Sequence, residues 1–90
     1  MDIDSTADPC EWIRSAPPRA LRGGVLALVP WEIALALKSA PDDVRALVLA
    51  VMMPDDRIAV QALIVNLGRV RVSDVEEMQA RLVSAIARAM

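Results

Sequence analysis

The chain has 90 residues, of which 56% are hydrophobic and 24% are charged, and its net charge is −2. This length suits one domain with a single core, and the high apolar content excludes an intrinsically disordered chain. The absence of a basic excess argues against nucleic acid as a partner, because phosphate binding needs clustered cations. With one cysteine, Cys10, and no histidine, we expect no zinc, haem or iron–sulfur site and no other cofactor.

The cysteine usage and the charge pattern favour the cytoplasm. One cysteine cannot form an internal disulfide, which fits a reducing compartment. The longest uncharged run, residues 58–68, is shorter than the roughly 20 apolar residues of a transmembrane helix, so we expect no membrane insertion. Residues 1–8 are acidic and polar, unlike the basic start of a secretory signal. We expect them to form a flexible segment ahead of a folded domain over residues 9–90.

Prolines divide this domain into short helical segments. Pro9, Pro18, Pro30, Pro41 and Pro54 each stand at or just before a stretch of helix-forming residues, where the fixed φ of proline suits the first turn. In chain order, we expect helices over residues 10–14, 18–22, 31–38, 42–51, 57–66 and 74–90. No stretch convincingly predicts a strand. The predicted fold class is therefore all-α, a compact bundle of about five or six short helices.

Three local features refine these segments. Asp8 is the expected N-cap of the first helix. Gly23 and Gly24 are expected to weaken any continuation of the second helix, because glycine is a poor helix former. The last helix carries one apolar stripe that we expect to face the core, made of Val75, Met78, Leu82, Ile86 and Ala89.

The run from Gly68 to Glu77 predicts a helix end, a short extended link and a helix start. Gly68 can adopt the left-handed conformation that closes a helix. Ser73, followed three residues later by Glu76, predicts a capping box. The junction as a whole resembles the C-terminal domain of the flagellar motor switch protein FliG. That family typically reads Leu-Gly-Pro-Val-Arg-Leu-x-Asp-Val-Glu-Glu at this point.

Three further stretches resemble the FliG family in the same order. Pro-Pro-Arg-Ala-Leu at residues 17–21 stands where the family has Asp-Asp-Arg-Ala-Ile. Glu-Ile-Ala-Leu-Ala-Leu-Lys-Ser-Ala at 32–40 is similar to Asp-Leu-Ala-Leu-Ala-Leu-Lys-Gly-Ala, and Asp-Asp-Val-Arg at 42–45 to Glu-Glu-Val-Arg. The likeness covers residues 11–88. It implies a compact helical domain and a non-enzymatic protein-interaction role at the cytoplasmic rotor ring.

In the FliG family, a ridge of charged residues on one helix faces the stator and transmits torque, and this chain departs from that ridge. Lys38 and Arg71 keep two of the family's functional basic positions. Asp55 stands where the ridge has a basic residue, and Ala62 and Leu63 stand where it has a pair of acids. The resemblance therefore implies ancestry and fold, whereas these losses weaken the expectation of direct torque generation. We keep Lys38, Arg71 and Asp55 as candidate electrostatic contacts.

The stretch from Ile58 to Val65 is apolar nearly all round, so one buried face cannot account for it. One interpretation is that its exposed side is covered by another chain, because exposed apolar patches mark interfaces. The other is that this segment is the central core helix, with the remaining helices wrapped around it. We favour the interface, for which the candidate residues are Leu47, Ile58, Ala62, Leu63 and Val65.

The remaining candidates have simpler structural explanations. The pairs Asp42-Asp43 and Asp55-Asp56 follow prolines at helix starts, where capping explains them better than metal or acid–base chemistry. Trp12 and Trp31, the two aromatic residues, could anchor an interface, although packing at helix starts is the favoured role. With no histidine or tyrosine and no nucleophile–base pair, the chain is not expected to be an enzyme.

Two functions follow from this sequence. The first is a rotor- or switch-associated protein of bacterial motility that docks onto flagellar rotor or stator components. Its expected location is cytoplasmic, peripheral to the inner membrane at the flagellar base. The second is a repurposed FliG-like adaptor or regulator outside the motor, acting as a homodimer or partner-binding module. In both, the mechanism is protein–protein docking, and we expect a homo-oligomer.

Overall fold

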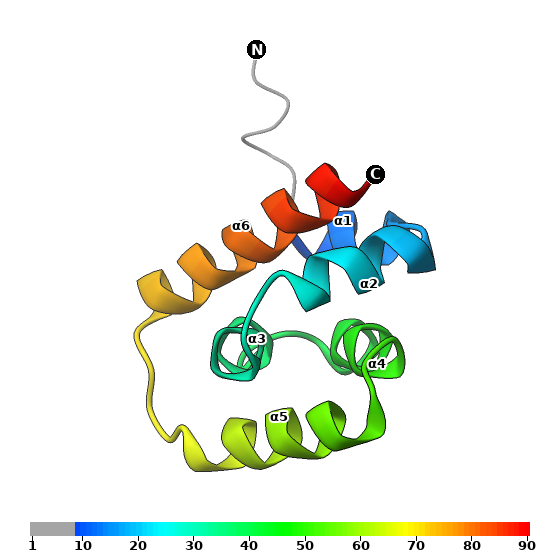
Figure 1. The fold of residues 1–90 in the computed structure, drawn as a ribbon. Helices are drawn as coiled ribbons and strands as arrows, with labels where there is room; N and C mark the ends of the chain where they lie inside the picture. The colour runs from blue at the N-terminus through cyan, green and yellow to red at the C-terminus, as the bar shows by residue number, and fades with distance from the viewer. Residues whose placement is uncertain (1–8) are drawn as a thin grey trace.

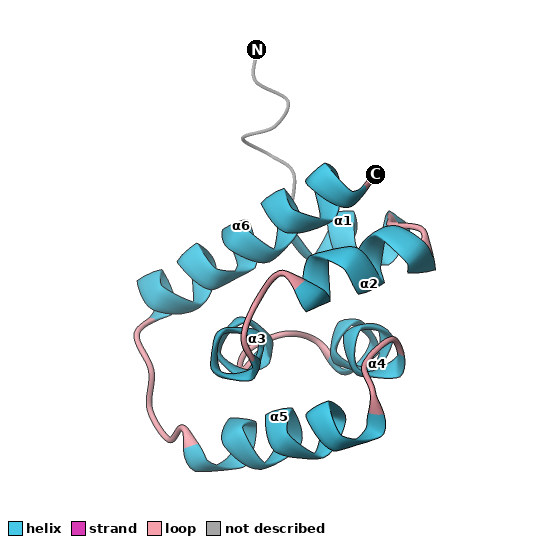
Figure 2. Cartoon of the chain, viewed as in Figure 1, coloured by secondary structure: helices cyan, strands magenta, loops and turns pink. Residues whose placement is uncertain are grey.

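The computed structural model describes residues 9–90 and shows six helices joined by short connections (Figures 1 and 2). The helices are α1 (Pro9–Ser15), α2 (Pro18–Leu26), α3 (Pro30–Leu37), α4 (Asp42–Ala50), α5 (Pro54–Asn66) and α6 (Val72–Ala89). Proline is the first residue of α1, α2, α3 and α5, as expected for a first turn. Residues 9–90 contain no strand, so the predicted all-α class is confirmed. The predicted flexible segment 1–8, with the Asp8 cap, lies outside the described residues.

The central helix of the fold is α3. It packs against α6 on one side and α5 on the other, so that α5 and α6 lie on opposite sides of the molecule (Figure 1). Five consecutive side chains of α3 are buried: Ile33, Ala34, Leu35, Ala36 and Leu37. The interpretation in which residues 58–65 form the central helix is therefore wrong. In α5 only Val60 is fully buried, because α5 packs on the outside of α3.

Two apolar clusters hold the helices together. The larger one joins all six helices, and its least exposed large side chains are Ile13, Ile33, Leu37, Val44, Val48, Val60, Leu82 and Ile86. The smaller one joins the outer side of α3 to the start of α6 through Leu35, Ala36, Val75 and Met78. The predicted stripe of α6 is buried at Val75, Met78, Leu82 and Ile86, but Ala89 is exposed and Ala85 takes the inward position.

The second helix continues through Gly23 and Gly24, contrary to the prediction that these glycines would weaken it. The reason is a close approach of α2 and α6. A Cβ atom on Gly24 would lie 2.5 Å from Ile86 Cγ1 and 2.9 Å from the Ile86 backbone nitrogen. A Cβ atom on Gly23 would lie 2.7 Å from the Cβ of Ala89. The missing side chains therefore let α6 rest directly on the backbone of α2, and this packing outweighs the low helix propensity.

The link between α5 and α6 agrees with the prediction at one end and not at the other. Gly68 has a φ of 65°, the left-handed conformation predicted to close the preceding helix. The predicted capping box at Ser73 and Glu76 is wrong. The first turn of α6 closes on the carbonyl oxygen of Arg71, which accepts hydrogen bonds from the amides of Asp74 and Val75, both at 3.1 Å. Ser73 therefore lies within the helix, where its side chain caps nothing.

Cationic side chains bind the backbone carbonyls at the ends of two helices. Arg45 Nη2 donates to the carbonyl oxygens of Leu37 at 3.3 Å and Ala40 at 3.4 Å, just where α3 ends. Arg57 Nε donates to the carbonyl oxygen of Leu49 at 2.9 Å, in the last turn of α4. The carbonyls of Leu37 and Leu49 also accept from the amides of Ala40 and Met52, just past their helices, and a positive charge suits the negative end of the helix dipole.

A salt bridge joins the N-terminal helix to α4. Arg14 Nε donates to Asp43 Oδ2 at 2.7 Å and Arg14 Nη2 to Asp43 Oδ1 at 3.2 Å, so the pair is bidentate. The hydrogen bond from Arg14 lowers the pKa of the Asp43 carboxyl below its ordinary value of 3.8. Asp43 thus stabilises the α1–α4 contact through Arg14, and hydrogen bonds from the amides of Asp43 and Val44, in the first turn of its own helix, also lower its pKa.

Substituting Gly24 by alanine tests the close approach of α2 and α6. Helix propensity alone predicts that Gly24→Ala stabilises the protein by about 0.5–1 kcal/mol. We expect the opposite, a loss of about 1–3 kcal/mol in the free energy of unfolding, because the new Cβ overlaps the backbone of α6. Chemical denaturation measures the difference. Gly23→Ala is the matched comparison and should cost less, because it meets only Ala89, at the C-terminal end of α6, where the helix end can shift more easily than the helix interior at Ile86.

Substituting Asp43 by asparagine tests the α1–α4 salt bridge through its pH dependence. Because the folded pKa is lowered, the carboxylate stabilises the fold above its ordinary pKa, and this stabilisation is lost as pH falls through the folded pKa. Asp43→Asn should therefore lower stability at pH 7 and flatten the loss of stability between about pH 5 and pH 2. Urea midpoints across this range measure both effects. The control is Asp56→Asn, which removes an exposed carboxylate without an ion-pair partner among residues 9–90. Its stability should fall with pH as steeply as that of the wild type.

Candidate functional site

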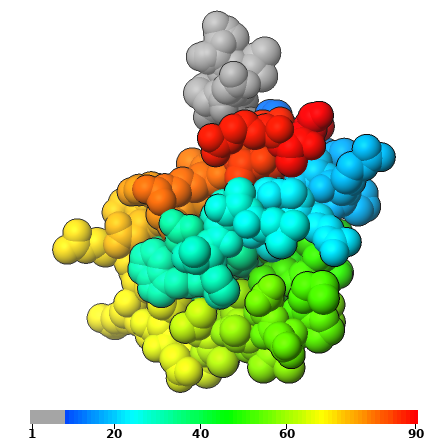
Figure 3. Space-filling view, in the orientation of Figure 1, coloured from blue at the N-terminus to red at the C-terminus, as the bar shows by residue number. Residues whose placement is uncertain are grey.

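The outward face of α5 exposes apolar side chains. Val60 points into the core, and on the opposite side of the helix Ile58 is 65% exposed and Val65 is 78% exposed. Ala62, which is also exposed, lies between them at helical spacing. We call Ile58, Ala62 and Val65 the α5 seam. Figure 3 shows that α5 forms one edge of the molecule, with no other helix covering it from outside.

The structure separates the other two predicted interface residues from this seam. Leu63 is only partly exposed and packs against the larger core cluster, since it faces α3. Leu47 belongs to α4 and is 40% exposed, one turn after Asp43. The structure therefore places three of the five predicted interface residues on one helix face. Whether any of them meets a partner stays a prediction.

Charged side chains lie near both ends of α5. Asp55 and Asp56 are exposed in the first turn of α5, and Arg69 is exposed just beyond its last turn. No ion pair within residues 9–90 involves any of these three side chains. Asp55 and Asp56 thus place negative charge at the beginning of α5, whereas Arg69 lies on the α5–α6 link and lines the hollow between α3 and the start of α6.

Lys38, a predicted electrostatic contact, is engaged within the fold. Its Nζ donates to the backbone carbonyl oxygen of Ile64 at 3.1 Å, in the last turn of α5. It therefore performs for α5 the role that Arg45 performs for α3 and Arg57 for α4. The sequence did not reveal this role, because the carbonyl that Lys38 binds is distant in the chain.

Arg71 borders a separate hollow of about 450 Å³ between α3, the α5–α6 link and the start of α6. Leu35 and Met78 contribute apolar, buried side chains to its wall, and Trp31 stands over it with half of its surface exposed. Neither Trp31 at 51% nor Trp12 at 41% exposure is packed away at a helix start, contrary to the favoured expectation. Arg71 is exposed on the rim beside this apolar wall.

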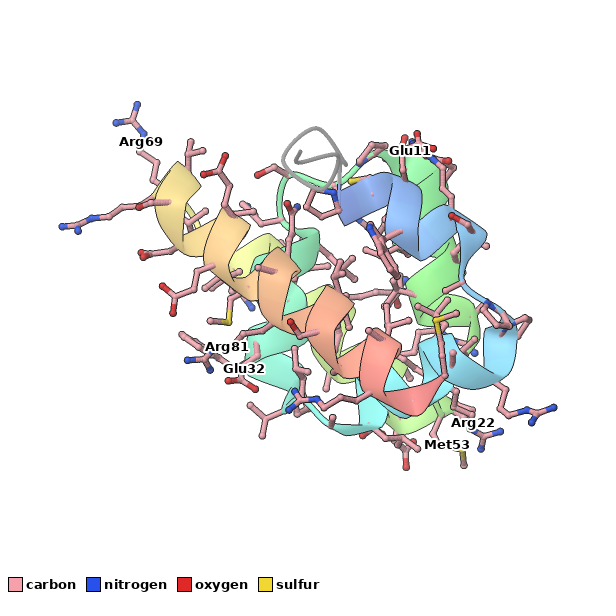
Figure 4. All side chains as sticks on the ribbon, turned by 90° about the horizontal axis from the view of Figure 1, so that it is seen from above. Glu11, Arg22, Glu32, Met53, Arg69 and Arg81 are labelled. Carbon is pink, nitrogen blue, oxygen red and sulfur yellow. The ribbon has the colours of Figure 1, made fainter. Side chains whose placement is uncertain are left out.

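Residues 9–90 contain no group of three carboxylate or cysteine side chains that could hold a metal ion. Cys10 is buried. No helix among the described residues is both long and apolar enough to pass through a bilayer. Besides the Arg14–Asp43 pair, a second interhelical ion pair joins α6 to α3: Arg81 lies 3.0 Å from Glu32 (Figure 4).

Comparison with known families gives one result. Residues 10–90 match the family model described as the FliG C-terminal domain. A search of curated proteins finds no match. The match spans nearly all described residues, so the resemblance inferred from the junction at residues 68–77 is confirmed.

Substituting Lys38 by methionine distinguishes a structural role from a partner contact. Methionine keeps an apolar stem but cannot donate to the Ile64 carbonyl. We expect a loss of about 1–2 kcal/mol in the free energy of unfolding, together with faster amide exchange in the last turn of α5. Arg71→Met, which removes an exposed cation, is the control and should change neither. Unchanged stability for Lys38→Met would contradict the structural role.

Proposed function

This chain belongs to the FliG C-terminal domain family, and from that membership we propose that it is a non-enzymatic, rotor- or switch-associated component of bacterial motility. The proposed mechanism is docking onto flagellar rotor or stator proteins. The proposed location is the cytoplasmic side of the inner membrane at the flagellar base. The family membership supports a role in the flagellar motor. The apolar surface of α5 suggests that this chain docks through apolar contacts, where the family's ridge uses charged ones.

The observation that carries this proposal is the exposed apolar seam on α5. A soluble helix normally turns its apolar side chains inward and its charges outward. Here Ile58 and Val65 face outward at 65% and 78% exposure, in place of a charged surface. Burying two such side chains against a partner would contribute about 1.5–3 kcal/mol each before the cost of association. An apolar partner surface therefore fits α5 better than a highly charged one.

A second candidate function is supported by the loss of the ridge charges. In the FliG family the ridge acts through charge, whereas here Ala62 replaces an acid, Asp55 reverses a base, and Lys38 is bound within the fold. A FliG-like adaptor or regulator outside the motor, acting as a homodimer or partner-binding module, would retain the fold without the ridge. The two functions differ in which proteins bind the seam.

Substituting Ile58 by aspartate tests the seam and the motor assignment together. Tagged wild-type protein should recover rotor or stator proteins from its native host, identified by mass spectrometry. Ile58→Asp should reduce that recovery at least tenfold, because it places a charge in an apolar contact. Ala80→Asp, at an exposed position of α6, is the control and should bind as the wild type does.

Two outcomes of this pull-down would contradict parts of the proposal. If the wild type recovers no flagellar protein while folding and expressing normally, the motor assignment is wrong and the adaptor function takes its place. If Ile58→Asp recovers the same flagellar proteins as the wild type, the motor assignment stands and the seam is not its docking surface.

A further inference from the structure

Among the helices of the described chain, α5 has the smallest buried part. Of its 13 residues only Val60 is buried, whereas α3 buries five of eight residues and α4 buries three of nine. Two further inward side chains of α5, Leu63 and Ile64, are partly buried where they pack against the larger apolar cluster. Helix α5 therefore rests on the domain along one narrow stripe.

A single helix, α3, provides most of the surface on which α5 packs, and α5 lies at the edge of the molecule opposite α6 (Figure 1). The other helices have more neighbours, since α6 packs against α1, α2 and α3, and α4 packs against α1 and α2. The core residues Ile13, Val44, Leu82 and Ile86 belong to α1, α4 and α6. A large part of the core is therefore made without α5.

Two cationic side chains fasten α5 to the rest of the domain, one near each end. At its beginning, Arg57 donates from Nε to the carbonyl oxygen of Leu49 at 2.9 Å and from Nη2 to that of Met52 at 3.1 Å. At its end, the carbonyl oxygen of Ile64 accepts from Lys38 Nζ at 3.1 Å. Hydrogen bonds from charged donors are stronger than neutral ones, so these contacts compensate in part for the narrow apolar stripe.

The link between α5 and α6 contains a glycine in open surroundings. Gly68 has a φ of 65°, and a Cβ atom placed on it would have no heavy atom of another part of the chain within 4 Å. Glycine reaches a wide range of backbone angles at little steric cost. The backbone at Gly68 can therefore change direction without a collision, as a hinge requires.

We propose that α5 is a strap that opens from α3 as one cooperative unit while the remaining helices stay folded, with Gly68 as its hinge and Lys38 and Arg57 holding the closed form. Parts of a protein with few buried apolar contacts open first, in units that often coincide with structural elements. Opening turns Val60 and the inner side of α5 to solvent and gives the domain a second form with more apolar surface. This proposal goes beyond the proposed function and holds whichever protein binds the domain.

Thiol labelling of the native protein measures the opening. In a Cys10→Ala background, Val60→Cys places a thiol on the inner side of α5, and Val44→Cys places the matched control in α4; neither valine has exposed surface. Labelling rates are divided by those of the same variants unfolded in urea. Residue 60 should then be labelled about tenfold faster than residue 44 or more, because it needs the strap alone to open, whereas residue 44 needs global unfolding.

Added substitutions distinguish strap opening from global unfolding. Gly24→Ala disturbs the α2–α6 packing, which the closed and open forms share, so it should speed labelling at residue 44 and leave residue 60 unchanged. Lys38→Met weakens the closed form alone and should speed labelling at both residues by the same factor, about tenfold or more. If Gly24→Ala does not fold, Asp43→Asn takes its place, because the α1–α4 salt bridge is also common to both forms.

Amide hydrogen exchange of the wild type tests whether the strap opens as a unit. The amides of residues 60–64 should share one protection factor and one dependence on denaturant, both smaller than those of Leu82 and Ile86 in α6. Protection that rises gradually from the end of α5 to its middle overturns the cooperative unit, since it indicates fraying. Equal labelling at residues 60 and 44, or faster labelling of residue 60 in Gly24→Ala, overturns the strap. None of these readouts depends on recovery of flagellar proteins, so they leave the motor assignment to its own test.

Discussion

The exposed carbonyl groups at the ends of short helices are the constraint on which this fold depends. Helices of eight to 13 residues, such as α3, α4 and α5, leave much of their backbone without intrahelical partners. Cations from elsewhere in the fold bind carbonyls at these ends: Arg45 at the end of α3, Arg57 at the end of α4 and Lys38, which directly follows α3, at the end of α5. Each contact stabilises a helix end and also fixes the position of one helix against another.

This arrangement explains why α5 presents an apolar face to the outside. It is held by Lys38 at one end and by Arg57 near the other, and its inner side packs on α3 through Val60. The opposite side of α3 is already covered by α6, which rests closely on α2 through Gly24. With the interior filled, the seam at Ile58 and Val65 has no place inside the domain and stays exposed.

Membership of the FliG C-terminal domain family gives this surface its significance. The basic position at Lys38 is conserved in type relative to the family pattern, yet here its ammonium group binds a helix end rather than facing solvent alone. Ala62 and Leu63, which we expected to stand at ridge positions, carry no charge, and Leu63 packs partly into the core. The chain thus combines the FliG C-terminal domain fold with an exposed α5 face that is apolar along the seam.

The sequence by itself determined the helices, because their starts and stops depend on local backbone preferences. The prolines at residues 9, 18 and 30 stand at helix starts and Gly68 ends a helix at positive φ, as predicted, whereas α5 begins at Pro54, three residues before its predicted start. Predictions from local patterns were wrong where packing against a neighbouring helix, or the exact helix start, determines the local structure. Gly24 continues a helix because α6 lies on it, and Ser73 caps nothing because α6 starts two residues earlier than predicted.

Only the tertiary structure decided which apolar helix is inside. By composition, α3 and α5 both qualify as central, since each carries a long apolar run. Burial depends on how many sides of a helix are covered by others. Because α3 lies between α5 and α6, its side chains are buried, whereas α5, covered on one side, exposes Ile58, Ala62 and Val65.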